Sequence, residues 1–91
     1  MNVKCNTYDG EYKFDKKHGF GIFCWASGNT YVGQYYRDER NGKGIMKWID
    51  GSSYDGEWLN GIQHGYGKMT NSDGKTVEGI FENNVIVSNS S

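Results

Sequence analysis

Large side chains and glycines alternate with polar residues over short stretches along most of the chain. The clearest stretch is YDGEW at 54–58, in which Tyr54 and Trp58 share one parity and the acidic Asp55 and Glu57 the other. Successive side chains of a β-strand point to opposite faces, so this alternation predicts strands with one ring-bearing and one polar face. No segment shows the sustained 3.6-residue apolar period of an amphipathic helix. The pattern therefore predicts an all-β chain.

The alternating pattern returns every 23 residues. YDGEY, YVGQY, YDGEW and VEGIF begin at residues 8, 31, 54 and 77, and HGFG, NGKG and HGYG follow at 18, 41 and 64. Thirteen of the 14 glycines occupy positions repeated in this way. Such a fixed period indicates an array of one structural unit. We predict a single domain, 1–91, with units 8–30, 31–53 and 54–76, a partial unit 77–87 and a polar tail 88–91.

Each unit has the features of a β-hairpin. The second residue of each expected tip is of a type that tolerates a left-handed backbone: Asp15, Asp38, Gly61 and Asn84. A Ser-Gly or Asp-Gly turn ending at Gly28, Gly51 or Gly74 then returns the chain to the next unit. Consecutive hairpins of this kind predict one antiparallel meander in a single layer.

Four-residue tips and three-residue return turns would keep the same side chains on one face, as the pleat requires. Three rows would then cross the sheet. The first row is bulky: Tyr8, Phe23, Tyr31, Met46, Tyr54, Met69 and Val77. The second is all glycine: Gly10, Gly21, Gly33, Gly44, Gly56, Gly67 and Gly79. The third alternates ring and glycine: Tyr12, Gly19, Tyr35, Gly42, Trp58, Gly65 and Phe81. We expect rings to lie flat over the glycine row, where they compensate the weak strand propensity of glycine.

The pattern Tyr-x-Gly-x-Tyr/Trp, then His/Asn-Gly-x-Gly, then Gly before the next Tyr resembles the MORN repeat (membrane occupation and recognition nexus) over residues 8 to about 82. The resemblance implies stacked hairpins in an elongated, twisted sheet with aromatic columns along a groove. It also implies scaffold or tethering roles at cytoskeletal, ciliary and membrane-junction sites. The chain departs from the pattern at Asp15 and Asp38, which replace a glycine, at Asn41, which replaces histidine, and in the fourth unit, which lacks the second glycine pair.

Composition narrows the possible functions. The formal net charge of −1 gives no overall basic field to attract nucleic acid, so no nucleic-acid partner is expected. His18 and His64 would lie roughly 19 Å apart, four strand spacings, and cannot share a metal ion. No nucleophile and base are paired by spacing, so we expect neither an enzyme nor a cofactor. Two cysteines, read as idle thiols in a reducing compartment, and no apolar run near ~18 residues predict a cytoplasmic protein.

The ring face is the preferred candidate site, because an exposed aromatic trough on a single-layer sheet usually marks an interaction surface. Its expected occupant is a protein partner, as a helix or an extended peptide, or a second copy of the chain. The candidate groove residues are Tyr8, Tyr12, Phe23, Trp25, Tyr31, Tyr35, Trp48, Tyr54, Trp58 and Phe81.

The alternative function is recruitment to an anionic phospholipid membrane, including phosphoinositides, through basic hairpin tips. The candidate residues are Lys16, Lys17, Arg37, Arg40, Lys43 and Lys47. The acidic residues Asp15, Asp38 and Glu39 on the same tips offset part of this charge. Open sheet edges raise a further question. Either Val85–Val87 forms a final strand, or an end of the array pairs with another chain in a homodimer.

Overall fold

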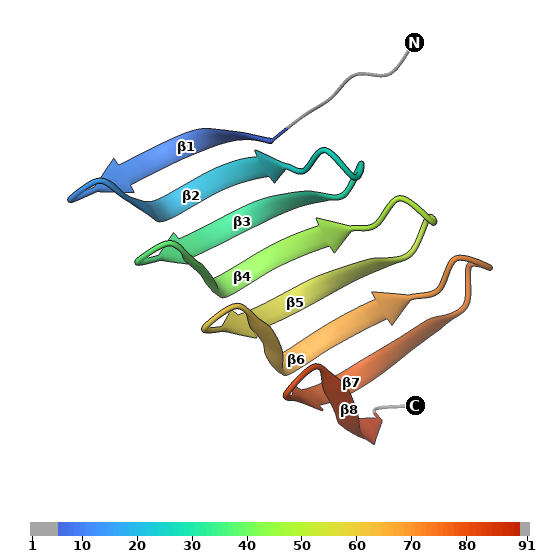
Figure 1. Ribbon diagram of the computed structural model, residues 1–91. Helices are drawn as coiled ribbons and strands as arrows, with labels where there is room; N and C mark the ends of the chain where they lie inside the picture. The colour runs from blue at the N-terminus through green and yellow to red at the C-terminus, as the bar shows by residue number, and fades with distance from the viewer. Residues whose placement is uncertain (1–5, 90–91) are drawn as a thin grey trace, which may run out of the picture.

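The computed structural model describes residues 6–89, and it confirms the all-β prediction. Within that range the chain forms eight strands and no helix. The strands are β1 (Thr7–Lys13), β2 (Lys16–Cys24), β3 (Thr30–Tyr36), β4 (Glu39–Lys47), β5 (Ser53–Leu59), β6 (Ile62–Thr70), β7 (Thr76–Glu82) and β8 (Val85–Asn89). They pair antiparallel in sequence order in one sheet, so each strand lies beside its neighbours in the chain (Figure 1).

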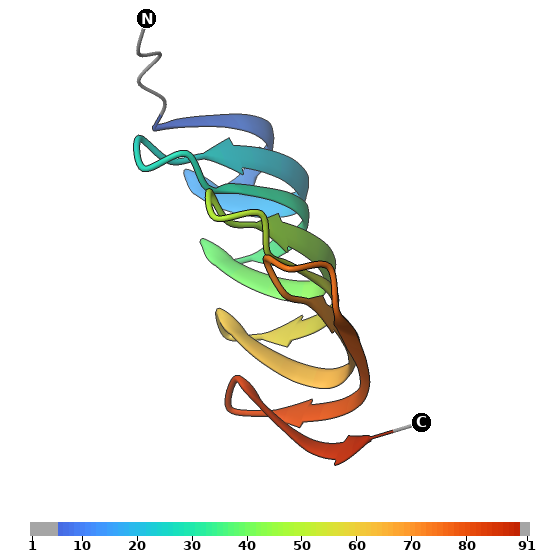
Figure 2. The same ribbon diagram turned by 90° about the vertical axis from the view of Figure 1, so that its right-hand side faces the viewer.

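The sheet is a single curved layer. Its principal extents are 40 × 35 × 16 Å. The strands bow along their length, so each hairpin forms an arch (Figure 2). We call the face that carries Tyr31 and Tyr54 the ring face, and it lies on the inner side of these arches. The opposite, outer face is called the back face. It presents Val32, Asp55 and the other residues of opposite parity to solvent.

Two of the three predicted rows are confirmed. The bulky row runs through the register pairs from Tyr8 opposite Phe23 to Met69 opposite Val77. The glycine row runs without a break from Gly10 to Gly79. The return turns are three-residue loops that close on a left-handed glycine; Gly28, for example, has φ +102°. Alternation and a constant period were sufficient to fix these features.

The predicted third row is wrong at the hairpin tips. Between units the third row is as predicted, with Gly19, Gly42 and Gly65 opposite Tyr35, Trp58 and Phe81. Within the hairpins it is not, because the tips have two residues and not four. The observed pairs are Tyr12 with Lys17, Tyr35 with Arg40, Trp58 with Gln63 and Phe81 with Ile86. In the first three hairpins, two extra residues on the second strand form a bulge that contains left-handed Gly19, Gly42 or Gly65. A bulge bends its strand and increases the local twist, which accounts for the arch.

Both residues of every tip are left-handed, as in a type I′ turn. The second residues are those predicted, and the first are Phe14, Arg37, Asn60 and Asn83. From the second hairpin on, each tip is also bonded to the preceding unit. The backbone nitrogen of Asp38 donates to the Lys17 carbonyl over 3.0 Å, and the Asp38 carboxylate accepts from the Lys17 nitrogen. Glycine could not make this second bond, which ties the Asp38 tip to the first unit.

The first tyrosine of each full unit lies across a pair of glycines. Tyr31 crosses Gly33 and Gly44, and its hydroxyl donates to the Gln34 carbonyl over 2.8 Å. A Cβ on Gly44 would overlap the Tyr31 ring. Tyr8 and Tyr54 repeat this arrangement in their own units. The missing side chains of the glycine row thus provide the space in which the core packs.

The array ends on a short final strand. β8 pairs with β7, so the first of the two alternatives for Val85–Val87 is the one observed. Ile86 packs against the buried cluster and covers the last ring, Phe81. β8 continues through Asn89, into the segment predicted as a polar tail.

We predict that Gly44→Ala destabilises the protein by about 1–3 kcal/mol, because its methyl group overlaps the Tyr31 ring in a packed core. Gly44 has no left-handed strain, so the cost is steric. In a Tyr31→Val background, which copies Val77 of the fourth unit, the same change should cost little, since alanine is intrinsically better in a strand by roughly 0.5–1 kcal/mol. Denaturant unfolding measures both. Equal costs in the two backgrounds would contradict this account.

We predict that Phe14→Asn stabilises the protein by about 1 kcal/mol. Phe14 has φ +53° and its side chain is 86 % exposed, so asparagine relieves backbone strain while little packing is lost. Phe14→Ala serves as the control, because it removes the ring without supplying a residue suited to this conformation. Thermal unfolding should rank Asn above both Ala and Phe, and an equal gain for Ala would refute the explanation.

Candidate functional site

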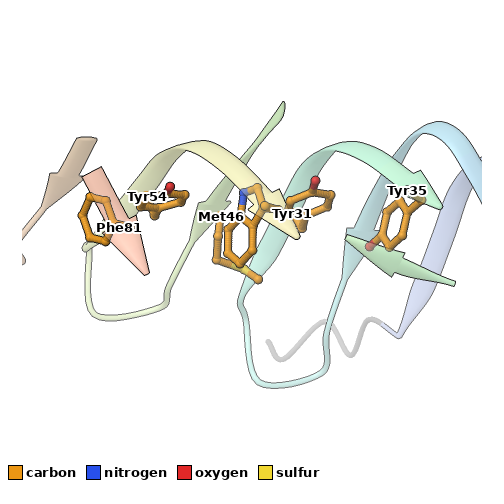
Figure 3. Packing of buried hydrophobic residues seen from close by; sticks show 6 residues of the cluster. Tyr31, Tyr35, Met46, Tyr54 and Phe81 are labelled. Atoms are coloured by element: carbon orange, nitrogen blue, oxygen red, sulfur yellow. The ribbon is translucent and has the colours of Figure 1, made fainter. Parts of the chain in front are cut away.

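A continuous chain of rings runs along the ring face, and Figure 3 shows the buried part of it. Its members meet edge to face, with centroids 5.0–5.6 Å apart and interplanar angles of 77–90°. In order, they are Tyr12, Tyr8, Tyr35, Tyr31, Trp58, Tyr54 and Phe81. Edge-to-face pairs contribute roughly 0.5–1.5 kcal/mol each beyond area burial. This chain is the core of the sheet.

Half of the candidate groove residues are therefore covered by their own neighbours. Tyr31, Tyr35, Tyr54, Trp58 and Phe81 are each no more than 5 % exposed. The other candidates remain reachable. Tyr8, Phe23, Trp25 and Trp48 are half-buried at the edge of the cluster, and Tyr12 is 60 % exposed. A partner on this face would meet mainly the second group.

Two cations that were predicted at the tips lie over the rings instead. The Lys17 ammonium is within 6 Å of the rings of Tyr8, Phe23 and Tyr35, and 3.6 Å from the Asp38 carboxylate. The guanidinium of Arg40 lies 4.9 Å from the Trp58 ring and 5.9 Å from the Trp25 ring, and it donates to the Gly61 carbonyl over 2.8 Å. Both follow from the two-residue tips, which turn positions 17 and 40 onto the ring face.

Two successive hollows open beside the ring chain. The first, of about 460 Å³, lies between Trp25 and Tyr35, with Lys17 and Arg40 in its wall. The second, of about 360 Å³, has a wall formed by Trp48, Trp58, Arg40 and Gln63. Each combines tryptophan with polar groups, and the second lies one unit further along the array.

Gln63 occupies the position of Lys17 and Arg40 in the third unit. It is 5 % exposed, and its Oε1 accepts no hydrogen bond from the described residues. A buried acceptor without a donor costs free energy. The Gln63 side chain is part of the wall of the second hollow, where it stands in place of a cation.

The remaining candidates for lipid binding are divided between the tips, where Lys16 and Arg37 lie together, and strand β4. Lys16 pairs with Lys13 at the first tip, and the Arg37 guanidinium carbon lies 5.3 Å from the centroid of the Tyr36 ring. Lys43 and Lys47 lie on β4, where Lys43 is opposite Glu57. With Lys17 and Arg40 on the ring face, the six cations are divided between two faces of the sheet.

Sequence reasoning missed an apolar strip on the back face. Ile22, Val32 and Ile45 face one another across β2, β3 and β4 and are 36–44 % exposed. Phe20, 54 % exposed, lies two residues from Ile22 on the same face. The sequence did contain a sign of this strip, because the equivalent residues on β5–β7 are charged: Asp55, Lys68 and Glu78. The difference becomes visible only when the same position is compared between units.

Burial and hydrogen bonding shift several pKa values. Burial raises the pKa of Tyr35 and of Tyr54 to about 12, and it also raises the pKa of Tyr31. Burial lowers the pKa of the Arg40 guanidinium, and the neighbouring phenols of Tyr35 and Tyr31 act in the opposite direction. A hydrogen bond from the Lys17 nitrogen lowers the pKa of Asp38. The ring face thus keeps its phenols protonated.

The remaining candidate residues are the histidines and the cysteines. Residues 6–89 contain no group of three or more His, Cys, Asp or Glu side chains that could hold a metal ion. His18 packs near the Tyr36 ring, with centroids 5.6 Å apart. Cys24 is disulfide-bonded, so the expectation of idle thiols is wrong for this residue, and Cys5 lies outside the described residues. Across the same range, no helix long and apolar enough for a bilayer is found.

We predict alkaline unfolding that begins near pH 10 and is complete near pH 12. Unfolded tyrosine loses its proton near pH 10, whereas folded Tyr35 and Tyr54 keep theirs to about pH 12. The unfolded state therefore binds fewer protons above pH 10, and the free energy of unfolding falls as pH rises through this window. Tyrosinate absorbance and circular dichroism should change together, and Tyr35→Phe should move the transition to higher pH. An unchanged midpoint in that variant would contradict the prediction.

Comparison with known proteins agrees with this geometry. A family model described as the MORN repeat matches residues 8–30, 31–53 and 54–76, the three full units that the sequence period defines. No curated protein matches the chain. MORN repeats are generally non-catalytic and suggest a module that interacts with proteins or membranes. Since the three matched units cover most of the chain and each forms one hairpin of the sheet, the chain belongs to the MORN repeat family.

Proposed function

We propose that the chain is a non-catalytic protein-interaction module that holds a segment of a protein partner along its ring face. The observation that supports this most directly is the pair of hollows beside the ring chain. Each has a half-buried tryptophan, Trp25 or Trp48, and both share Arg40. Tryptophan and arginine are the residues most often found at the energetic centres of protein interfaces.

The spacing of the hollows favours a helix as the bound segment. Successive units are two strands apart, and strands lie about 4.8 Å apart, so equivalent points of the two hollows are separated by roughly 10 Å. Residues i and i+7 of an α-helix are about 10.5 Å apart along its axis, on nearly the same side. A helix that crosses the strands inside the arch can therefore place one side chain in each hollow.

The polar groups of the hollows indicate the chemistry of those side chains. In the first hollow, Lys17 and Arg40 offer donors to an acidic or amide side chain, although Asp38 and Glu39 in the same wall moderate the charge. In the second, the wall carries Gln63 in place of a second cation, which suits a neutral polar side chain such as an amide or a hydroxyl. The segment we propose is amphipathic, with polar groups at heptad spacing among its apolar contacts.

We predict that Trp25→Ala combined with Trp48→Ala lowers partner capture at least tenfold, which corresponds to about 1.4 kcal/mol of binding free energy. Quantitative affinity capture from cell extract, with the partner identified by mass spectrometry, measures this loss. Ile49→Ala is the matched control, because Ile49 is 74 % exposed on the turn beside Trp48. Circular dichroism checks that the variants keep the sheet.

The same experiments distinguish a protein partner from the two alternatives, a second copy of the chain and a membrane. Capture of the chain itself, with a dimer in sedimentation analysis, would assign the ring face to a second copy. Binding to phosphoinositide vesicles that Lys16→Glu and Arg37→Glu abolish, with no effect of the tryptophan changes, would favour the membrane alternative. An unchanged set of captured proteins in the double tryptophan variant would refute the proposal.

A further inference from the structure

One row of the back face is apolar over β2–β4 and charged over β5–β7. Ile22, Val32 and Ile45 form an unbroken row over β2–β4, and Phe20 extends it toward the tips. The same row continues over β5–β7 as Asp55, Lys68 and Glu78. The repeat therefore does not require apolar residues at these positions. Exposed β-branched and aromatic side chains gathered in this way are typical of an interaction surface.

A basic pocket lies at the tip end of the same face. Its volume is about 320 Å³, and Lys13, Lys16 and Arg37 line it beside the rings of Phe14 and Tyr36. No carboxylate contributes to its wall. Lys13 and Lys16 are directly opposite each other, and like charges in this relation destabilise a hairpin. The other tips carry Tyr36 with Glu39, Leu59 with Ile62, and Glu82 with Val85 at the same positions. The pairing of Lys13 with Lys16 therefore lowers the stability of the first hairpin, and the repeat pattern does not require it.

Acidic residues flank the strip on both sides. Asp9 lies opposite Ile22 on β1, and Asp55 lies opposite Ile45 on β5. Strands β1 and β5 are separated by four inter-strand spacings, or roughly 19 Å. A helix with its side chains is about 10–12 Å in diameter. A single helix that runs along the strands therefore fits between the two carboxylates without contact with either.

We propose that the back face over β1–β4 is a second docking surface, which binds an amphipathic helix of a protein partner. The apolar side of the helix lies on Phe20, Ile22, Val32 and Ile45, and its acidic end lies in the pocket of Lys13, Lys16 and Arg37. From Lys16 to Ile22 the strand extends about 20 Å, so roughly 13 residues of helix cover both parts. This surface is separate from the ring face and does not depend on the function proposed there.

Two other occupants fit less well. The back face is the outer side of the arch, so two copies would touch along a narrow crown and leave the basic pockets uncovered. A flat bilayer would also touch the crown first, and its anionic headgroups would meet Asp9 and Asp55 as well as the cations. A narrow segment with acidic residues at one end avoids both problems.

The test is selection from a displayed library of 16-residue helical peptides with randomised sequence, using the whole chain as target. We expect enriched peptides with an apolar i, i+3, i+4, i+7 face and two or more acidic residues at one end. A synthetic copy of such a peptide should lose affinity at least tenfold with Ile22→Asp and with Lys13→Glu combined with Lys16→Glu. Fluorescence anisotropy measures the affinities.

The matched control is Ile80→Asp. Ile80 lies on the same face and is 44 % exposed, as is Ile22, but it belongs to β7, outside the proposed surface. Its substitution should change the affinity less than twofold. Ile22→Thr, which keeps a β-branched side chain, replaces Ile22→Asp if the latter fails to fold. The Trp25→Ala and Trp48→Ala variant should bind normally, which separates this surface from the ring face.

Several outcomes would overturn the proposal. They are the absence of enriched peptides, enrichment of peptides without an acidic end, and an equal loss of affinity with Ile80→Asp. Binding that only the tryptophan variant removes would assign the peptides to the ring face. Binding of the chain to vesicles of phosphatidylcholine and phosphatidylserine is measured in a separate experiment. If they bind the chain with the same sensitivity to Ile22→Asp and the lysine changes, the occupant is a membrane and not a helix.

Discussion

A tyrosine ring lying on two glycines is the contact on which the rest of this structure depends. A single-layer sheet has no second layer against which to bury its side chains. Here the rings of Tyr31 and Tyr54 pack on the backbone of their own hairpin, and their hydroxyls bond to carbonyls three residues ahead. The glycine row leaves room for this, and edge-to-face contacts then join one unit to the next. The core is one ring thick.

This core divides the residues of each unit into two classes. The tyrosines, the glycine row and the left-handed tip residues recur because they build the core and the turns of each hairpin. Other positions on the same face vary from unit to unit, such as Lys17, Arg40 and Gln63. Variation at these positions changes the charge and hydrogen bonding of the hollows while the rings beneath stay in place. Binding properties can therefore differ along an array whose fold is constant.

Curvature gives the two faces different uses. The bulges at Gly19, Gly42 and Gly65 bend the strands, so the ring face lies inside the arches and the back face outside. An inner face can surround a helix and contact it from several strands. An outer face offers a narrower strip, and on β2–β4 that strip is apolar with a basic pocket at one end. One thin sheet thus provides two surfaces of unlike shape and charge.

The sequence by itself determined the strand class, the unit boundaries, the bulky and glycine rows and the left-handed tips, because alternation and a constant period encode which face a side chain takes. It did not distinguish a four-residue tip from a two-residue tip with a two-residue bulge, since both keep the faces in phase. Only the tertiary structure decided that Lys17 and Arg40 lie over rings, and that five candidate rings are buried by their neighbours. It also assembled Ile22, Val32 and Ile45 into one strip, because those residues become adjacent only when three strands pair.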